Sequence, residues 1–172
     1  NMGLLPGNAR TGEAMIFLGA TARLGQIVTA LSPLRSVADY VLIDMPPSRA
    51  AGFDELLQTS DWVVIPTQLE RAALEGVLLM AQTVAGMDHT RLLGVVPNMI
   101  RIQTKEHRAQ LEDLISALGQ AIWPALPLSI RVTEAFTFGT TLFDLCPGDP
   151  ITETMNKVVD RFLNAEVRNG RA

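Results

Sequence analysis

Three short apolar runs, each followed by a segment of helical periodicity, constrain the fold of this 172-residue chain most strongly. The runs cover residues 40–43, 62–65 and 92–96, and unbroken apolar strands are typical of parallel sheets covered on both faces. Helical patterns occupy residues 70–85 and 104–118. Strands that alternate with helices predict right-handed crossovers, so we expect an α/β fold with an open, mostly parallel sheet and helices on both faces.

Weaker patterns complete the predicted order of elements. Further helices are expected over residues 11–31, 54–59, 132–138 and 151–164, and a short strand over residues 124–128. The length and the 48% hydrophobic content suit one domain with a single core. No apolar run approaches the roughly 20 residues that a membrane-spanning helix needs.

Charge and cysteine content narrow the class of protein. The formal net charge of −4 and the pI near 5.1 argue against a wholly basic nucleic-acid binder, although a local basic patch stays open. The first residues show no basic segment before an apolar one, so no secretory signal is expected. The single cysteine, Cys146, cannot form an internal disulfide, which favours a cytoplasmic location.

The carboxyl ends of the predicted strands hold the candidate ligand-binding residues, because ligands of open parallel sheets bind there. These ends carry Asp44, residues 66–68 and residues 97–98. Asp44 ends an apolar run and precedes Pro46 and Pro47, an arrangement typical of a Walker B aspartate that holds Mg²⁺ through water. The alternative is an ordinary aspartate that caps a turn.

A Walker B aspartate needs a phosphate-binding loop of the form G-x-x-x-x-G-K-[ST] as its counterpart. No glycine in this chain precedes a lysine, the first lysine is Lys105, and no G-x-G-x-x-G occurs. Either the phosphate loop lies upstream of these residues, or the chain does not bind nucleotide in the usual way.

Other chemistries have little support in the sequence. His89 and His107 are isolated, no G-x-S-x-G elbow occurs, and Cys146 has no histidine near it in the sequence. Arg101, Lys105 and Arg108 lie with His107 in a small basic cluster at a predicted helix start. Such a cluster is most often a solvated face, and a contact to DNA phosphates is the functional alternative.

Four segments together give the chain a resemblance to the ParA/MinD family of deviant-Walker P-loop ATPases, nearest to its ParA (Soj-like) partitioning branch. YVLIDMPPS resembles the Walker B and switch II segment, and SDWVVIPTQLERAALEGV resembles the next strand and helix of that family. LLGVVPNMI is similar to the strand that carries an adenine-contacting asparagine. LPLSIRVTEAFTFGTTLFDLCP resembles the Pro-rich segment and the V-x-E-A helix.

The resemblance implies a P-loop NTPase-type fold that binds ATP and Mg²⁺ and hydrolyses ATP in DNA partitioning. Asp44 would hold Mg²⁺ through water, Pro46 and Pro47 would belong to the switch, Asn98 would contact the base, and Pro127 would border the adenine pocket. The implied DNA-contacting residues are Arg101, Lys105, Arg108 and Arg131. The implied partners are nonspecific DNA, a ParB-like activator and a second copy in a sandwich dimer, with a nucleoid-associated location in the cytoplasm.

The missing phosphate loop is where the chain departs from that family. We therefore expect residues 1–172 to be the C-terminal two-thirds of a single ParA-type ATPase domain, N-terminally truncated and inactive in isolation. A catalytically degenerate ParA-fold module for binding or dimerisation is the first alternative. A MinD-like membrane-associated ATPase is the second, and the C-terminal residues 157–172 carry too few apolar side chains for a lipid-facing stripe.

Overall fold

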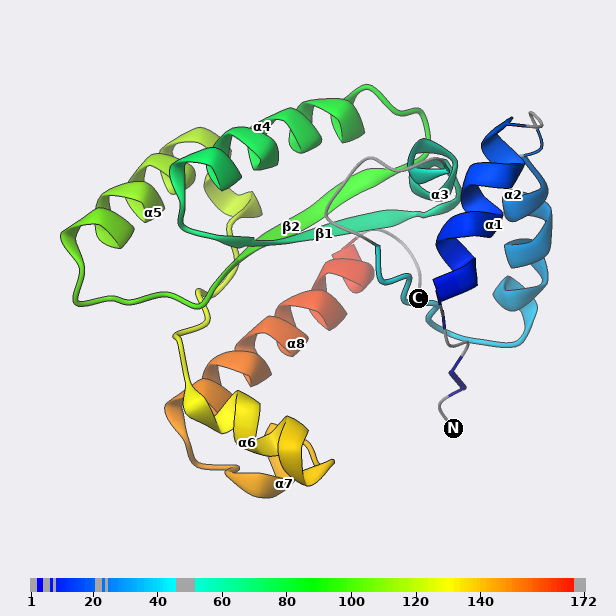
Figure 1. Ribbon diagram of the computed structural model, residues 1–172. Coiled ribbons are helices and arrows are strands. Elements are labelled where there is room, and N and C mark those ends of the chain that lie inside the picture. Colours follow the sequence, from blue (N-terminus) through cyan, green and yellow to red (C-terminus); the bar gives the residue numbers. More distant parts are fainter. Residues whose placement is uncertain are drawn as a thin grey trace. The chain divides into compact units, whose positions relative to one another are not determined.

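The computed structural model describes residues 3–4, 7, 9–20, 23, 25–45 and 52–168 (Figure 1). The chain divides into two compact units. Unit 1 comprises residues 1–61 and 87–90, and unit 2 comprises residues 62–86 and 91–172.

Unit 1 is helical in its described part. Its elements are α1 (Ala9–Ala20), α2 (Gly25–Leu31), the 3₁₀ turn η1 (Ser32–Ser36) and α3 (Phe53–Thr59). The single helix expected over residues 11–31 is therefore two helices, whereas the helix expected over residues 54–59 is confirmed as α3. Arg35 links η1 to the C-terminal end of α3, because its guanidinium contacts Asp61 at 3.1 Å and donates to the Thr59 carbonyl at 2.9 Å.

The prediction of a strand over residues 40–43 is wrong. These residues have no regular secondary structure, and their side chains are exposed rather than covered on both faces, with Leu42 85% exposed. An isolated extended segment gains no ladder hydrogen bonds, and within the described residues no strand pairs with this one. Apolar character alone was not sufficient to make the strand.

Unit 2 contains the parallel sheet. β1 (Trp62–Gln68) leads through α4 (Arg71–Ala85) into β2 (Arg91–Asn98), which lies parallel to β1 from the Trp62↔Arg91 pair to the Gln68↔Asn98 pair. The register shifts after the Val63↔Leu92 pair, because Leu93 is an extra residue in β2. This β1-α4-β2 unit confirms the predicted parallel sheet.

A third segment extends the sheet on the other side of β2. Residues 122–128 run parallel to β2 through isolated bridges, with the Trp123 N–H donating to the Val95 carbonyl at 2.9 Å and the Leu126 N–H to the Pro97 carbonyl at 2.8 Å. The short strand expected over residues 124–128 is thus present as an irregular strand rather than a regular one.

Helices cover both faces of the unit 2 sheet (Figure 1). They are α4 and α5 (Lys105–Leu118) on one face and α6 (Ile130–Phe138), α7 (Leu142–Leu145) and α8 (Pro150–Arg168) on the other, with the 3₁₀ turn η2 (Gly119–Ala121) after α5. Val95 packs toward Val77 of α4 and Leu114 of α5. Its neighbour Val96 faces the second core, which includes Ile151 of α8. The expectation of helices on both faces is confirmed.

Two prolines that were expected to end strands lie inside them instead. Pro66 pairs with Val96 in the middle of the β1–β2 ladder, and Pro97 is fully buried in β2. Proline lacks only the N–H donor, so it is compatible with a strand where that donor is not needed. The Pro97 carbonyl still accepts from Leu126. β1 consequently ends at Gln68 and β2 at Asn98, three and two residues beyond the apolar runs that the sequence indicated.

Candidate functional site

The carboxyl edge of the unit 2 sheet brings together two residues that the sequence singled out separately. Asn98 is the last residue of β2, and Pro127 lies on the adjacent parallel segment. The segments are held in register there, because the Ile100 N–H donates to the Leu126 carbonyl at 3.0 Å and the Leu128 N–H donates to the Ile100 carbonyl at 3.0 Å. The structure therefore places the Asn98 amide and the Pro127 ring on neighbouring strand ends.

Asn98 is held by residues to which sequence reasoning gave no role. Its Oδ1 accepts a hydrogen bond from the Met99 backbone N–H at 2.8 Å. Met99 has φ 55°, the one described non-glycine residue in the left-handed region, a conformation that costs energy for most side chains. The Gln68 side-chain amide of β1 in turn donates to the Met99 Sδ at 3.4 Å. Sequence placed residues 66–68 at this edge, but only the strand register shows that Gln68 faces Asn98.

Asp44 lies in unit 1, on the irregular segment that precedes residue 46, and it is exposed. The Walker B prediction expected it at the end of a buried strand, and residues 40–43 do not form that strand in this chain. Pro46 and Pro47 lie outside the described residues. The magnesium role of Asp44 and the switch role of the two prolines stay predictions.

The basic cluster surrounds the start of α5. Thr104 caps the helix, with its Oγ1 accepting from the His107 N–H at 3.4 Å. The Arg101 N–H donates to His107 Nδ1 at 3.1 Å, which fixes the loop before the helix. The side chains of Arg101, Lys105 and Arg108 are exposed.

The position of these cations is unfavourable for the helix itself. Lys105 and Arg108 stand in the first turn of α5, where the positive end of the helix dipole favours acidic side chains instead. Glu106 lies in the same turn and is the kind of side chain that this end of the helix favours.

Arg131 differs from the other three basic residues because two carboxylates already surround its guanidinium. It contacts Glu134 at 2.8 Å within α6 and Asp149, just before α8, at 3.6 Å. The hydrogen bond and the charge of Glu134 raise the pKa of the Arg131 guanidinium above its ordinary value. Arg131 thus connects α6 to the start of α8, and its DNA role stays a prediction.

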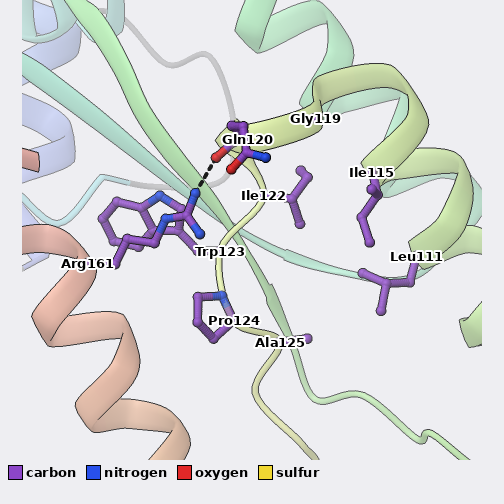
Figure 2. A pocket seen from close by; sticks show the side chains of 9 residues that line it. All are labelled: Leu111, Ile115, Gly119, Gln120, Ile122, Trp123, Pro124, Ala125 and Arg161. Atoms are coloured by element: carbon purple, nitrogen blue, oxygen red, sulfur yellow. Dashed lines mark hydrogen bonds between the residues drawn. The ribbon is translucent and has the colours of Figure 1, made fainter.

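An open groove of about 400 Å³ lies at the other end of the third segment (Figure 2). Leu111 and Ile115 of α5 line one side, and Trp123 and Pro124 belong to the segment itself. Arg161 of α8 donates to the Gln120 carbonyl there, as the dashed line in Figure 2 shows. The groove includes neither Asn98 nor Pro127, so it is separate from the candidate site.

The side chains that meet at the carboxyl edge are uncharged. Asn98 offers an amide and Pro127 an apolar ring, whereas none of the residues linked here, Gln68, Asn98, Met99 and Pro127, carries a charge. Within the described residues no group of three His, Cys, Asp or Glu side chains could hold a metal ion. Nor does this part of the chain contain a helix long and apolar enough to cross a membrane.

Comparison with known proteins identifies the family of the chain. A family model described as an AAA domain matches residues 1–93. The chromosome-partitioning ATPase Soj of Thermus thermophilus is 31% identical over 154 residues, which is 85% of this chain and 62% of that protein. The chromosome partitioning protein ParA of Caulobacter vibrioides is 33% identical over 157 residues, 84% of this chain and 59% of that protein.

Solved structures show the same fold at lower identity. Apo McdA from Cyanothece superposes with a TM-score of 0.77 at 22% identity, covering 92% of this chain and 67% of that one. The cell division protein MinD of Aquifex aeolicus gives a TM-score of 0.66 at 18% identity, covering 87% and 61%. The chain spans about 60% of the length of the curated relatives it matches.

Proposed function

Since the chain belongs to the ParA/MinD family of P-loop ATPases, in its partitioning branch, we propose that it carries the base-binding and magnesium-side parts of an ATPase site. The observation that supports this most is the carboxyl edge of the unit 2 sheet, where Asn98 and Pro127 lie on adjacent strand ends. Ligands of open parallel sheets bind at that edge. Both units would belong to one ATPase domain.

In this proposal the described residues recognise the nucleotide at its base. The Asn98 amide hydrogen-bonds the base, and Pro127 packs against it. Asp44 holds Mg²⁺ through water, and Pro46 and Pro47 belong to the switch. The bound cation would neutralise charge on the phosphates during transfer to water.

The phosphate-binding part is not supplied by these 172 residues. Phosphoryl transfer depends on a lysine and backbone amides around the phosphates, and no glycine-lysine pair occurs in this chain. We therefore expect the 172-residue chain by itself to have no ATP turnover above background, and turnover to require a G-K-[ST] loop encoded elsewhere in the reading frame.

The cations at the start of α5 would serve DNA binding. Arg101, Lys105 and Arg108 are exposed and would bind backbone phosphates without regard to sequence. By likeness to Soj and ParA, whose names describe chromosome partitioning, the protein would act on the nucleoid as a homodimer stimulated by a ParB-like partner.

The test is ATP turnover by the protein expressed from its complete reading frame, with DNA present. We expect Asp44→Asn to reduce kcat by at least about 100-fold, because the variant loses the carboxylate that holds the cation. Asp39→Asn is the matched control, an exposed carboxylate on the same irregular segment, and should leave kcat unchanged. Equal turnover by wild type and Asp44→Asn would refute the assignment of Asp44.

A catalytically degenerate module for binding or dimerisation is the second candidate. Exposed apolar side chains on α6 favour it, because Ile130, Phe136 and Phe138 are 72%, 88% and 69% exposed. Absence of nucleotide binding by the complete protein, together with a stable dimer in sedimentation, would favour this candidate over the ATPase.

A further inference from the structure

The groove of about 400 Å³ beside the third segment combines apolar walls with one cation (Figure 2). Leu111 and Ile115, one turn apart on α5, line one end, and Arg161 of α8 lies at the other. Ile122 and Pro124 of the third segment line the part in between. All of these residues belong to unit 2. The volume is within the range of sites that bind small molecules.

The cation of this groove has no anionic partner among the described residues. Arg161 is half-buried, and none of the carboxylates that the structure describes is ion-paired to it. Its guanidinium donates to the Gln120 carbonyl, whereas a guanidinium has five N–H donors in a planar fork that matches a carboxylate. Removing a charge from water is costly unless an opposite charge lies beside it. A ligand carboxylate would supply that charge.

The backbone beside the groove argues against an added β-strand as the occupant. Pro124 and Pro127 of the third segment have no N–H donor. The N–H groups of Trp123 and Leu126 already donate to carbonyls of β2. An edge with so few donors is poorly suited to strand pairing. The groove therefore offers side chains, rather than a backbone ladder, to what it binds.

We propose that this groove binds a small molecule that combines one carboxylate with an apolar body. The carboxylate pairs with the Arg161 guanidinium, and the apolar body packs against Leu111 and Ile115. The groove includes neither Asn98 nor Pro127, so the inference does not depend on the proposed nucleotide site.

The experiment uses octanoate as the probe and 1-octanol, which has the same chain length and no charge, as its matched comparison. NMR titration of the protein expressed from its complete reading frame locates the site and measures dissociation constants. We expect octanoate to shift the amide signals of residues 119–125 and to bind roughly 10-fold or more tightly than 1-octanol, because hydrogen bonds to charged groups are strong. Hexanoate, two CH₂ groups shorter, should bind up to about 15-fold more weakly than octanoate.

Variants separate the charged contact from the apolar one. Arg161→Gln should weaken octanoate binding roughly 10-fold and leave 1-octanol binding unchanged. Lys157→Gln, which removes another cation from an exposed position of α8, is its control. Ile115→Ala should weaken the binding of both probes severalfold, and Leu79→Ala, at an exposed position of α4, should weaken neither.

A further variant keeps the test decisive if Arg161→Gln does not fold. Ile115 is 47% exposed, so Ile115→Glu is compatible with the fold, and its carboxylate should repel octanoate more than it weakens the binding of 1-octanol. Equal affinities of wild type for octanoate and 1-octanol would overturn carboxylate recognition. Octanoate-dependent shifts that spare residues 119–125, or no shifts at all, would overturn the site itself.

Discussion

Gly94 of β2 lies directly against the indole of Trp123, so closely that a Cβ atom on Gly94 would overlap the Nε1 and Cε2 atoms of the ring. Trp123 is 4% exposed and donates its backbone N–H to Val95. The absence of a side chain at Gly94 thus allows a large aromatic residue of the third segment to pack over β2.

We expect Gly94→Ala to lower the free energy of unfolding by about 2 kcal/mol or more, because the indole must move out of a packed core. Urea unfolding followed by Trp fluorescence measures the change. Gly76→Ala is the control: nothing lies within 4 Å of its Cβ position in α4, so alanine should stabilise the helix by up to about 1 kcal/mol. Equal effects of both variants would contradict the close packing at Gly94.

The positive φ of Met99 leads to a second prediction about stability. A β-branched side chain is a marked outlier at positive φ, so Met99→Val should destabilise the protein by about 1–2 kcal/mol. Met99→Leu should cost less than about 0.5 kcal/mol, since leucine has similar size and no branch at Cβ. Thermal unfolding of the two variants provides the comparison. If valine were tolerated as well as leucine, the left-handed conformation of Met99 would be excluded.

Thr90 joins two parts of unit 1 through its side chain. It is 1% exposed, and its Oγ1 lies 2.7 Å from the Leu57 carbonyl and 3.0 Å from the Ser60 carbonyl. Thr90→Val keeps the shape but leaves buried carbonyls without this donor, so we expect a loss of about 1–3 kcal/mol. Thr133→Val, on the exposed face of α6, should change stability by less than about 0.5 kcal/mol. Chemical denaturation measures both variants. If Thr90→Val were as stable as Thr133→Val, the Thr90 side chain would only fill space.

The arginines at α5 and α6 should differ in DNA binding, because only Arg131 is ion-paired to Glu134 and Asp149. Arg108→Gln should weaken binding and lower the salt slope of log K by about one unit. Arg131→Gln should lower that slope by less than Arg108→Gln does, because Glu134 and Asp149 already neutralise part of the Arg131 charge. Lys157→Gln, at an exposed position of α8, is the charge-matched control. Titrations at several salt concentrations measure the slopes, and a drop of about one unit for Arg131→Gln would support its predicted phosphate contact.

The site could be predicted from the sequence only in part. Asn98 and Pro127 were identified by resemblance to a family, and the parallel arrangement of their segments followed from the strand and helix pattern. Gln68 was identified only as one of residues 66–68 at this edge, and Met99 was not identified, because the contact between them depends on strand register and on one backbone dihedral angle, which no local pattern encodes. Arg131 looked equivalent to Arg108 in the sequence, and only its two carboxylate neighbours distinguish them.

The sequence by itself determined the order of elements in unit 2, because apolar periodicity and capping residues such as Thr104 are local properties of the chain. Tertiary structure alone decided whether an apolar run becomes a strand. Residues 62–65 pair with β2, whereas the equally apolar residues 40–43 pair with no strand in the part of the chain that the structure describes, and they stay exposed. The physical reason is that a strand is stabilised by hydrogen bonds and side-chain contacts with its neighbours, which lie far away in the sequence.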